Sequence, residues 1–98
     1  MKWHPEAKEE YESAAFLIDE DRPGYGDRFV KAVRSKLKLV QHFPRLGTRI
    51  TDVDGEVRRV IVDRFSYKLI IGIVDDEPWV VAVAHFRRSP DYWHHRLQ

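Results

Sequence analysis

Apolar residues recur with the period of an α-helix in two stretches of the first half of the chain. In residues 5 to about 20, one face gathers Ala7, Tyr11, Ala14, Ala15 and Ile18. From about Asp27 to His42, a second face gathers Phe29, Val33, Leu37 and Val40. Spacings of three and four residues place such side chains on one side of a helix. The stretch DEDRPGYG (19–26) between them is rich in turn residues, so the sequence predicts an antiparallel helical hairpin.

The second half of the chain changes to the pattern of β-strands. Three runs are rich in β-branched and aromatic residues: 57–62, 67–74 and 79–86. A fourth candidate strand, 48–53, precedes the hairpin signal Asp54-Gly55. The turns between the three runs are short, and short turns make neighbouring strands antiparallel. We therefore expect a four-stranded antiparallel meander, with Met1–Trp3 as a candidate for a further, very short strand.

Alternation along the central strands predicts that both faces of the sheet are covered. In 67–74, one face holds Tyr67, Leu69, Ile71 and Ile73, and in 79–86 one face holds Trp79, Val81, Val83 and His85. The opposite faces are also largely apolar, as in strands buried on both sides. The expected fold is α+β, with the helical hairpin on one face of the sheet and a short C-terminal helix after Pro90. With 98 residues, the chain suits a single domain, 1–98.

Charge is unevenly distributed, although the net charge is only +1. Residues 1–27 hold eight acids and three bases, whereas residues 28–49 hold seven bases and no acid. A basic segment of this kind favours an acidic partner, either nucleic acid or an acidic protein segment. For a charge run alone, however, a solvated helix face is the favoured interpretation.

Several classes of protein are disfavoured by what the sequence lacks. It has no cysteine, no apolar run of the ~20 residues that span a bilayer and no apolar N-terminal signal. We expect a soluble cytoplasmic protein with no cofactor. Metal binding is not expected either, because adjacent residues such as His94 and His95 point in different directions on a helix. No phosphate-binding glycine loop and no nucleophile elbow around a serine is present.

A metal-free RNA cleavage site is the catalytic chemistry that the residues could support. It would need a proton donor or acceptor, for which His85 qualifies because its ordinary pKa is about 6.5. Cations would hold the phosphate, and the candidates are Arg59, Lys68, Arg87 and Arg88. Tyr92 could stack on a base or donate a proton. For each of these residues taken singly, an ordinary structural role is the favoured interpretation, with Tyr92 and Trp93 capping the core.

Four segments in order resemble one family of bacterial proteins. They are HPEAKEEYESAAFLI, FPRLGTRI, VRRVIVDRFSYKLIIGI and VAVAHFRRSPDYWHHR. Together they cover nearly the whole chain, and their order and spacing resemble the RelE/ParE superfamily of toxins from type II toxin–antitoxin modules. The last segment is similar to the ParE-like branch in its alanine–histidine, basic pair, proline and tyrosine–tryptophan. The fold that this resemblance implies, a helical hairpin on an antiparallel sheet, agrees with the elements predicted above.

The resemblance implies a growth-inhibiting toxin that a cognate antitoxin neutralises in a heterodimer or a higher hetero-oligomer. Operator DNA would be bound only through the antitoxin. RelE-like members cut messenger RNA on the ribosome. ParE-like members inhibit DNA gyrase and have no established hydrolytic chemistry of their own.

The two branches differ in the cations that a cleavage site needs. The RelE-like pattern has two basic residues on the second of the main strands. Arg59 matches the first of them, but Ile61 falls where the second would lie. Lys68 replaces the arginine of the next strand, and Phe86 falls where the last-strand arginine would lie, with Arg87 only adjacent. Each missing contact would cost about 10²–10³-fold in rate. Although Tyr92 matches the aromatic position, these departures favour the ParE-like branch.

We therefore expect a toxin that binds DNA gyrase and has no catalysis of its own. The alternatives are a ribosome-dependent endoribonuclease and a non-toxic relative that only binds a partner. The candidate surface for target or antitoxin comprises Arg58, Arg59, Arg87, Arg88, Tyr92 and Trp93. For a ribonuclease, the candidate catalytic group would be Arg59, Lys68, His85, Arg88 and Tyr92.

Overall fold

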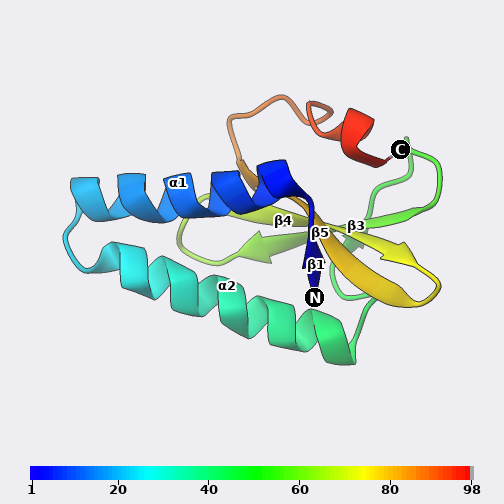
Figure 1. The fold of residues 1–98 in the computed structure, drawn as a ribbon, viewed down its shortest axis with the longest axis horizontal. Helices are drawn as coiled ribbons and strands as arrows, with labels where there is room; N and C mark the ends of the chain where they lie inside the picture. Colours follow the sequence, from blue (N-terminus) through cyan, green and yellow to red (C-terminus); the bar gives the residue numbers. More distant parts are fainter. Residues whose placement is uncertain (98) are drawn as a thin grey trace.

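Both predicted helices form, and each begins at a local signal in the sequence (Figure 1). The structure is a computed structural model that describes residues 1–97. Helix α1 spans Pro5–Asp21, and His4 caps it by accepting the Glu6 N–H at Nδ1, 3.1 Å away. Helix α2 spans Tyr25–His42, two residues longer at its start than expected. Each helix buries part of the face that its apolar residues predicted.

A tight corner joins the two helices. Gly24 adopts φ of 90°, a conformation open mainly to glycine. Asp19 Oδ1 accepts the N–H groups of Gly24 and Gly26 at 2.9 and 3.1 Å. Gly26 lies so close to α1 that an added Cβ would come within 2.8 Å of the Ala15 carbonyl oxygen. The helices can therefore cross closely only with glycine at this position.

The sheet contains the predicted meander and the very short further strand for which Met1–Trp3 was the candidate. Its members are β1 (Lys2–Trp3), β2 (Thr48–Arg49), β3 (Glu56–Val62), β4 (Tyr67–Val74) and β5 (Glu77–His85), in the order β1-β5-β4-β3-β2. Strands β2 to β5 are antiparallel, as expected, although β2 has two residues instead of six. The candidate strand at Met1–Trp3 is confirmed as β1, and because β1 runs parallel to β5, the five-stranded sheet is mixed. Parallel strands need a long connection between them. Here the helical hairpin and strands β2 to β4 form the connection from β1 to β5.

A β-bulge in β5 overturns the simple alternation expected for that strand. Opposite β4, the pairing moves from Ala82 directly to Val80, so Val81 is an extra residue. Val81 and Ala82 both pack in the cluster on the sheet face away from the helices, whereas Val80 and Val83 pack on the helix face. The expectation that Val81 and Val83 share a face was therefore wrong.

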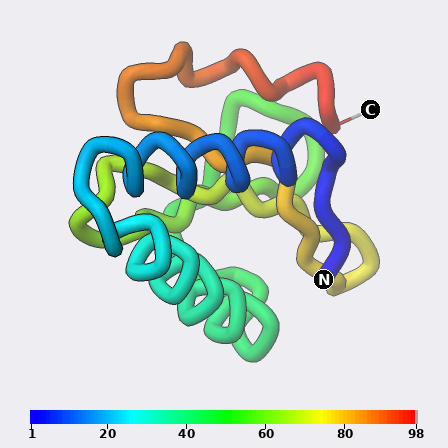
Figure 2. The backbone as a smooth tube through the Cα atoms, turned by 60° about the vertical axis from the view of Figure 1, so that its left-hand side comes forward, coloured from blue at the N-terminus to red at the C-terminus, as the bar shows by residue number. Residues whose placement is uncertain are grey.

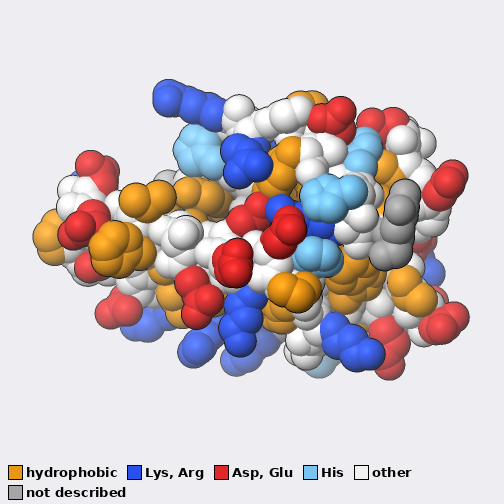
Figure 3. Space-filling model, turned by 45° about the horizontal axis from the view of Figure 1, so that its top comes forward, with side chains coloured by type: hydrophobic (Ala, Val, Ile, Leu, Met, Phe, Trp, Pro, Cys, Tyr) orange, Lys and Arg blue, Asp and Glu red, His pale blue; other side chains and the backbone are white. Residues whose placement is uncertain are grey.

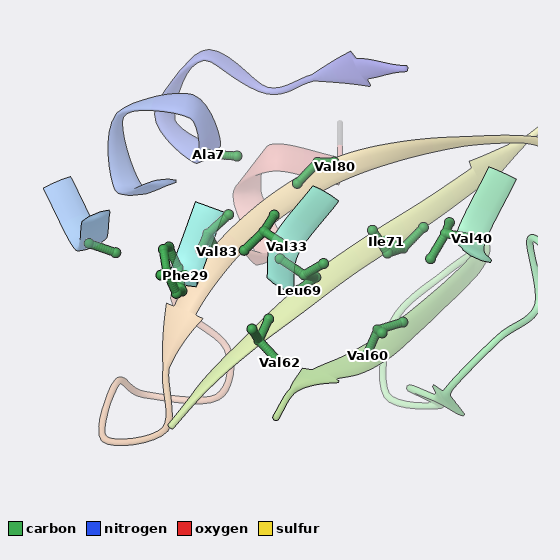
Figure 4. Packing of buried hydrophobic residues seen from close by; sticks show 11 residues of the cluster. Ala7, Phe29, Val33, Val40, Val60, Val62, Leu69, Ile71, Val80 and Val83 are labelled. Carbon is green, nitrogen blue, oxygen red and sulfur yellow. The ribbon is translucent and has the colours of Figure 1, made fainter. Parts of the chain in front are cut away.

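Two cores lie on opposite faces of the sheet, as the apolar character of both faces predicted. Under the helices, Phe29 and Val33 of α2 meet Leu69 and Ile71 of β4 (Figure 4). On the other face, the fully buried Trp93 covers a smaller cluster: Val57, Ile70, Val81 and Ala82. The C-terminal segment therefore forms part of the hydrophobic core. The expected terminal helix is a single 3₁₀ turn, η1 (His94–Leu97).

An ion pair between the first helix and the last turn closes the outer edge of β5. Strand β1 pairs only with Trp79 and Val80, so the edge is open beyond them. There, Val83 donates its N–H to Glu10 Oε1 at 3.0 Å, and the Val81 carbonyl accepts from Arg96 Nη1 at 3.1 Å. Two further bonds of 2.9 Å join Glu10 and Arg96 in a fork. We call this arrangement the Glu10–Arg96 clasp; its two side chains substitute for a missing neighbouring strand.

The clasp is electrostatically reinforced from α1. Glu6 Oε2 lies 3.0 Å from Arg96 Nη2 and 3.6 Å from His95 Nε2. Figure 3 looks onto this side, where acidic and basic side chains lie together. Burial alone would raise the pKa of Glu10, but the hydrogen bonds from Arg96 and Val83 outweigh it and hold that pKa below its ordinary value. The clasp therefore keeps Glu10 ionised.

Within residues 1–97, no helix is long and apolar enough to cross a membrane, and no group of three or more potential metal ligands is found.

Candidate functional site

Three cations surround a hollow on the sheet face away from the helices. Arg59 of β3 stands opposite Ile70 of β4, and Lys68 of β4 stands opposite Ile61 of β3. Directly opposite residues share a face of a sheet, so Arg59 and Lys68 point to the same side. Arg49, at the end of β2, completes the set, and the hollow has a volume of about 250 Å³. We call it the basic hollow, defined by Arg49, Arg59 and Lys68.

The basic hollow is suited to holding an anion. Among the residues that line it, Asp52 is the only acid, and Pro90 and Trp93 form part of its wall. None of its three cations forms an ion pair within residues 1–97. Grouped cations that outnumber the acids around them raise the local potential and attract negative partners. The hollow can therefore bind a phosphate or a carboxylate.

Arg58, a neighbour in sequence, does not join this group. Adjacent residues of a strand point to opposite faces, so Arg58 lies on the helix side. There its Nη1 donates to the Gly47 carbonyl at 3.1 Å. Its contact supports the segment between α2 and β2. The structure therefore separates Arg58 from Arg59, although both were candidates for one surface.

His85 also lies on the other side of the sheet from the basic hollow. It stands opposite Tyr67, and the two rings meet edge to face with centroids 5.0 Å apart. Lys68 stands opposite Ala84 instead, so Lys68 and His85 point to opposite faces. The His85 Nδ1 atom accepts the Arg87 N–H at 3.1 Å. The residues proposed for RNA cleavage are thus not brought into one site.

Tyr92 is a stacking surface and a poor proton donor. The Arg88 guanidinium lies 3.9 Å from the centre of its ring, and that of Arg96 lies 5.1 Å away. Burial, followed by the nearby Glu10 carboxylate, raises the pKa of Tyr92 far above its ordinary value. The hydroxyl proton is therefore held tightly at neutral pH.

Arg87 and Arg88 are both exposed, which fits the basic rim expected after β5.

Trp93 is not part of the candidate surface for target or antitoxin. Its side chain is 1% exposed and packs with Ile70 and Val81, so it is part of the core and is not offered to a partner by the folded surface. The alternative interpretation of the sequence, in which Trp93 caps the core, is confirmed.

Two features of this region were missed in the sequence. Arg49 was counted only as one of a basic run, although the hairpin signal Asp54-Gly55 predicted that its strand pairs with the next one. Pairing of β2 with β3 brings this segment beside the hollow, and Arg49 lines the hollow although its direct partner in the register is Arg58. The partnership of Glu10 and Arg96 was also missed, since the two lie 86 residues apart.

Comparison with known proteins identifies a family. A family model described as the ParE toxin of the type II toxin–antitoxin system parDE matches residues 1–90. The matched residues include α1, α2 and strands β1 to β5. The match ends before η1, the turn that carries Arg96. No curated protein matches the chain.

Proposed function

The chain belongs to the ParE toxin family of type II toxin–antitoxin systems, and we propose on this premise that it inhibits growth by binding DNA gyrase. Membership of the family implies an antitoxin partner. The choice of gyrase over the ribosome is our proposal. It places the protein's action in the cytoplasm, as a binder without catalysis of its own.

The observation that carries the proposal is the position of His85. RNA cleavage at neutral pH needs a proton-transfer group beside the cations that hold the phosphate. Among the candidate catalytic residues, His85 is the one whose ordinary pKa suits that task, and the sheet lies between it and the pair Arg59 and Lys68. Tyr92 is a weak substitute, because its pKa is raised. The arrangement supports binding of an anionic surface more than cleavage of RNA.

We assign the basic hollow to contact with the target. Its cations are free of ion pairs within the described residues, and Arg87 and Arg88 extend the positive surface along the chain after β5. A gyrase–DNA complex presents both acidic side chains and phosphates to such a surface. The antitoxin would neutralise the toxin by covering these cations, which fits an acidic segment that folds on binding.

A gyrase supercoiling assay tests the proposal. Relaxed plasmid, gyrase and ATP are mixed with the purified chain, and the proposal expects lost supercoiling and trapped linear DNA. The double variant Arg59→Ala, Lys68→Ala should lose this effect. A matched control, Lys31→Ala with Arg34→Ala, removes one lysine and one arginine from the exposed side of α2 and should retain it. Fully active gyrase at micromolar excess of the chain would refute the proposal.

One observation keeps a ribosome-dependent ribonuclease as the second candidate, namely that Arg59 and Lys68 do converge on one hollow with Arg49. Messenger RNA from cells that express the chain without its antitoxin decides between the two. Cuts that depend on translation, with gyrase unaffected, would favour the ribonuclease. Normal growth of those cells would instead indicate a non-toxic relative.

A further inference from the structure

We propose that a second pocket, on the helix side of the sheet, binds a nucleoside phosphate. It lies where the end of α1 and the start of α2 meet the β3–β4 turn (63–66), and its volume is about 730 Å³. Figures 1 and 2 both show the helix connection and this turn at the same end of the molecule. We call it the corner pocket. It is separate from the basic hollow, and the inference does not depend on which target the toxin has.

Two arginines are held at the rim by one tyrosine. The guanidinium groups of Arg22 and Arg28 lie 4.3 and 4.5 Å from the centre of the Tyr25 ring. Within residues 1–97 neither forms an ion pair, so both retain their full donor capacity. Stacking on an aromatic ring orients a guanidinium while leaving its N–H edge open. That edge matches the oxygens of a phosphate.

A third arginine reaches the pocket from a turn with unusual backbone geometry. Arg64 has φ of 74° and Ser66 has φ of 54°. Side chains other than Gly, Asn and Asp seldom adopt such angles, and turn formation alone favours those three residues. Arginine at this position is therefore poorly explained by the turn. Its place in the pocket lining gives it a different role, as a cation for a bound anion.

The floor of the pocket is aromatic and rigid. Phe65, Tyr67 and His85 line it. Behind them, the fully buried Phe29 packs edge-on against Phe65 and Tyr67, with centroids 5.4 and 5.2 Å apart. A fixed aromatic surface is what a flat nucleobase stacks on. Because the Nδ1 atom of His85 accepts the Arg87 N–H, neutral His85 carries its proton on Nε2, where it can donate to a base.

Charge and size favour a nucleoside phosphate over a bare anion or an apolar ligand. Two acids, Asp21 and Asp63, also line the pocket. Asp63 is offset by Lys36, 3.3 Å away, so the three arginines leave an excess of positive charge. Pockets of about 300–1,000 Å³ are typical for small-molecule ligands. A bare phosphate would leave the aromatic floor unused, and an uncharged ring would leave the arginines unused.

Chemical-shift mapping with adenosine monophosphate tests the proposal. The ¹⁵N-labelled full chain is titrated, and shifts are expected in residues 21–28 and 63–67. Saturation is expected below about 1 mM. Adenosine and inorganic phosphate, titrated separately, should each bind at least about tenfold more weakly, because each makes only part of the contacts. A 5′-phosphorylated single-stranded oligonucleotide that binds more tightly than the mononucleotide would identify the end of a strand as the source of the group; weaker binding would identify a free nucleotide.

Matched variants separate a specific pocket from general charge. Arg28→Ala and Arg64→Ala should each weaken binding of adenosine monophosphate about tenfold. Arg34→Ala removes an exposed arginine from the same helix outside this pocket and should leave binding unchanged. All three residues are exposed, so thermal unfolding should show intact folding.

Several results would overturn the proposal. Shifts confined to the basic hollow would mean that the nucleotide binds there instead. Equal losses in Arg28→Ala and Arg34→Ala would mean diffuse attraction. Inorganic phosphate binding as tightly as the nucleotide would remove the role of the aromatic floor. Absence of shifts up to about 10 mM would leave no site at all. None of these results bears on gyrase, so the two proposals fail independently.

Discussion

Replacing Arg96 with alanine should destabilise the protein severely, although Arg96 lies in the last turn of the described chain. Arg96 is only 6% exposed, and its guanidinium donates to both Glu10 oxygens and to the Val81 carbonyl. Breaking a buried ion pair by removing one partner costs about 3–5 kcal/mol, because the other charge is left uncompensated. The Glu10 side chain is 17% exposed and keeps the Val83 N–H, so water and this donor reduce the loss. We expect about 3 kcal/mol.

That loss would be easy to measure. Natural domains are stable by about 5–15 kcal/mol, so it would remove a large part of the total. For a domain of this size, each 1 kcal/mol lowers Tm by about 4–8 °C, which gives a decrease of about 12–24 °C. Urea and thermal unfolding followed by circular dichroism would measure it. Glu10→Gln and the double variant complete a mutant cycle that isolates the coupling between the two side chains.

The pH dependence provides a second check on the clasp. The pKa of Glu10 is lower in the folded protein than its ordinary value of 4.5. Its contribution to stability is therefore complete above that value and is lost as the pH falls through the lowered, folded pKa. The difference in stability between the natural protein and Arg96→Ala should shrink at strongly acidic pH. A loss below about 1 kcal/mol at neutral pH, or a difference independent of pH, would refute the ion-pair account.

Three further substitutions test other parts of the structure. Tyr67→Ala should lower the free energy of unfolding by about 2–4 kcal/mol, because it removes half-buried aromatic packing under the helices; normal thermal stability would contradict this. Arg88→Ala should weaken growth inhibition with little loss of stability, since its guanidinium covers only one face of Tyr92 at 3.9 Å; a large drop in Tm would make Arg88 a structural residue. Gly26→Ala should cost about 1–3 kcal/mol in urea unfolding, because the new Cβ would lie 2.8 Å from the Ala15 carbonyl oxygen; an unchanged midpoint would show that the helices can separate at no cost.

Local periodicity was sufficient to predict the helices and most of the sheet. The apolar stripe from Phe29 to Val40 and the strand 67–74 are found where the pattern placed them. The bulge at Val81 was not predictable from the pattern, because residues on both sides of it are small and apolar and give no sign of a change in phase. Strand β1 forms within the candidate Met1–Trp3, but a run of two residues carries no period, so its parallel pairing with β5 was not predictable.

The candidate site was predictable only in part, for a different reason. That Arg59 and Lys68 share a face follows from the register of one hairpin, which local turn chemistry largely determines. That His85 lies on the opposite face follows only from the register between β4 and β5, in which Lys68 stands opposite Ala84. Contacts between distant segments, such as Glu10 with Arg96, depend on the whole fold and leave no signal in either segment.

The clasp also fixes when the protein can finish folding. The chain emerges from the ribosome in order from its N-terminus. Glu10 therefore has no ion-pair partner until Arg96, 86 residues later in the sequence, has emerged. Until Trp93 and Arg96 have emerged, one face of the sheet has no cover and the edge of β5 has no closure. Native structure is therefore reached only once Arg96 has emerged, and a chain cut short before Trp93 has an open, aggregation-prone edge.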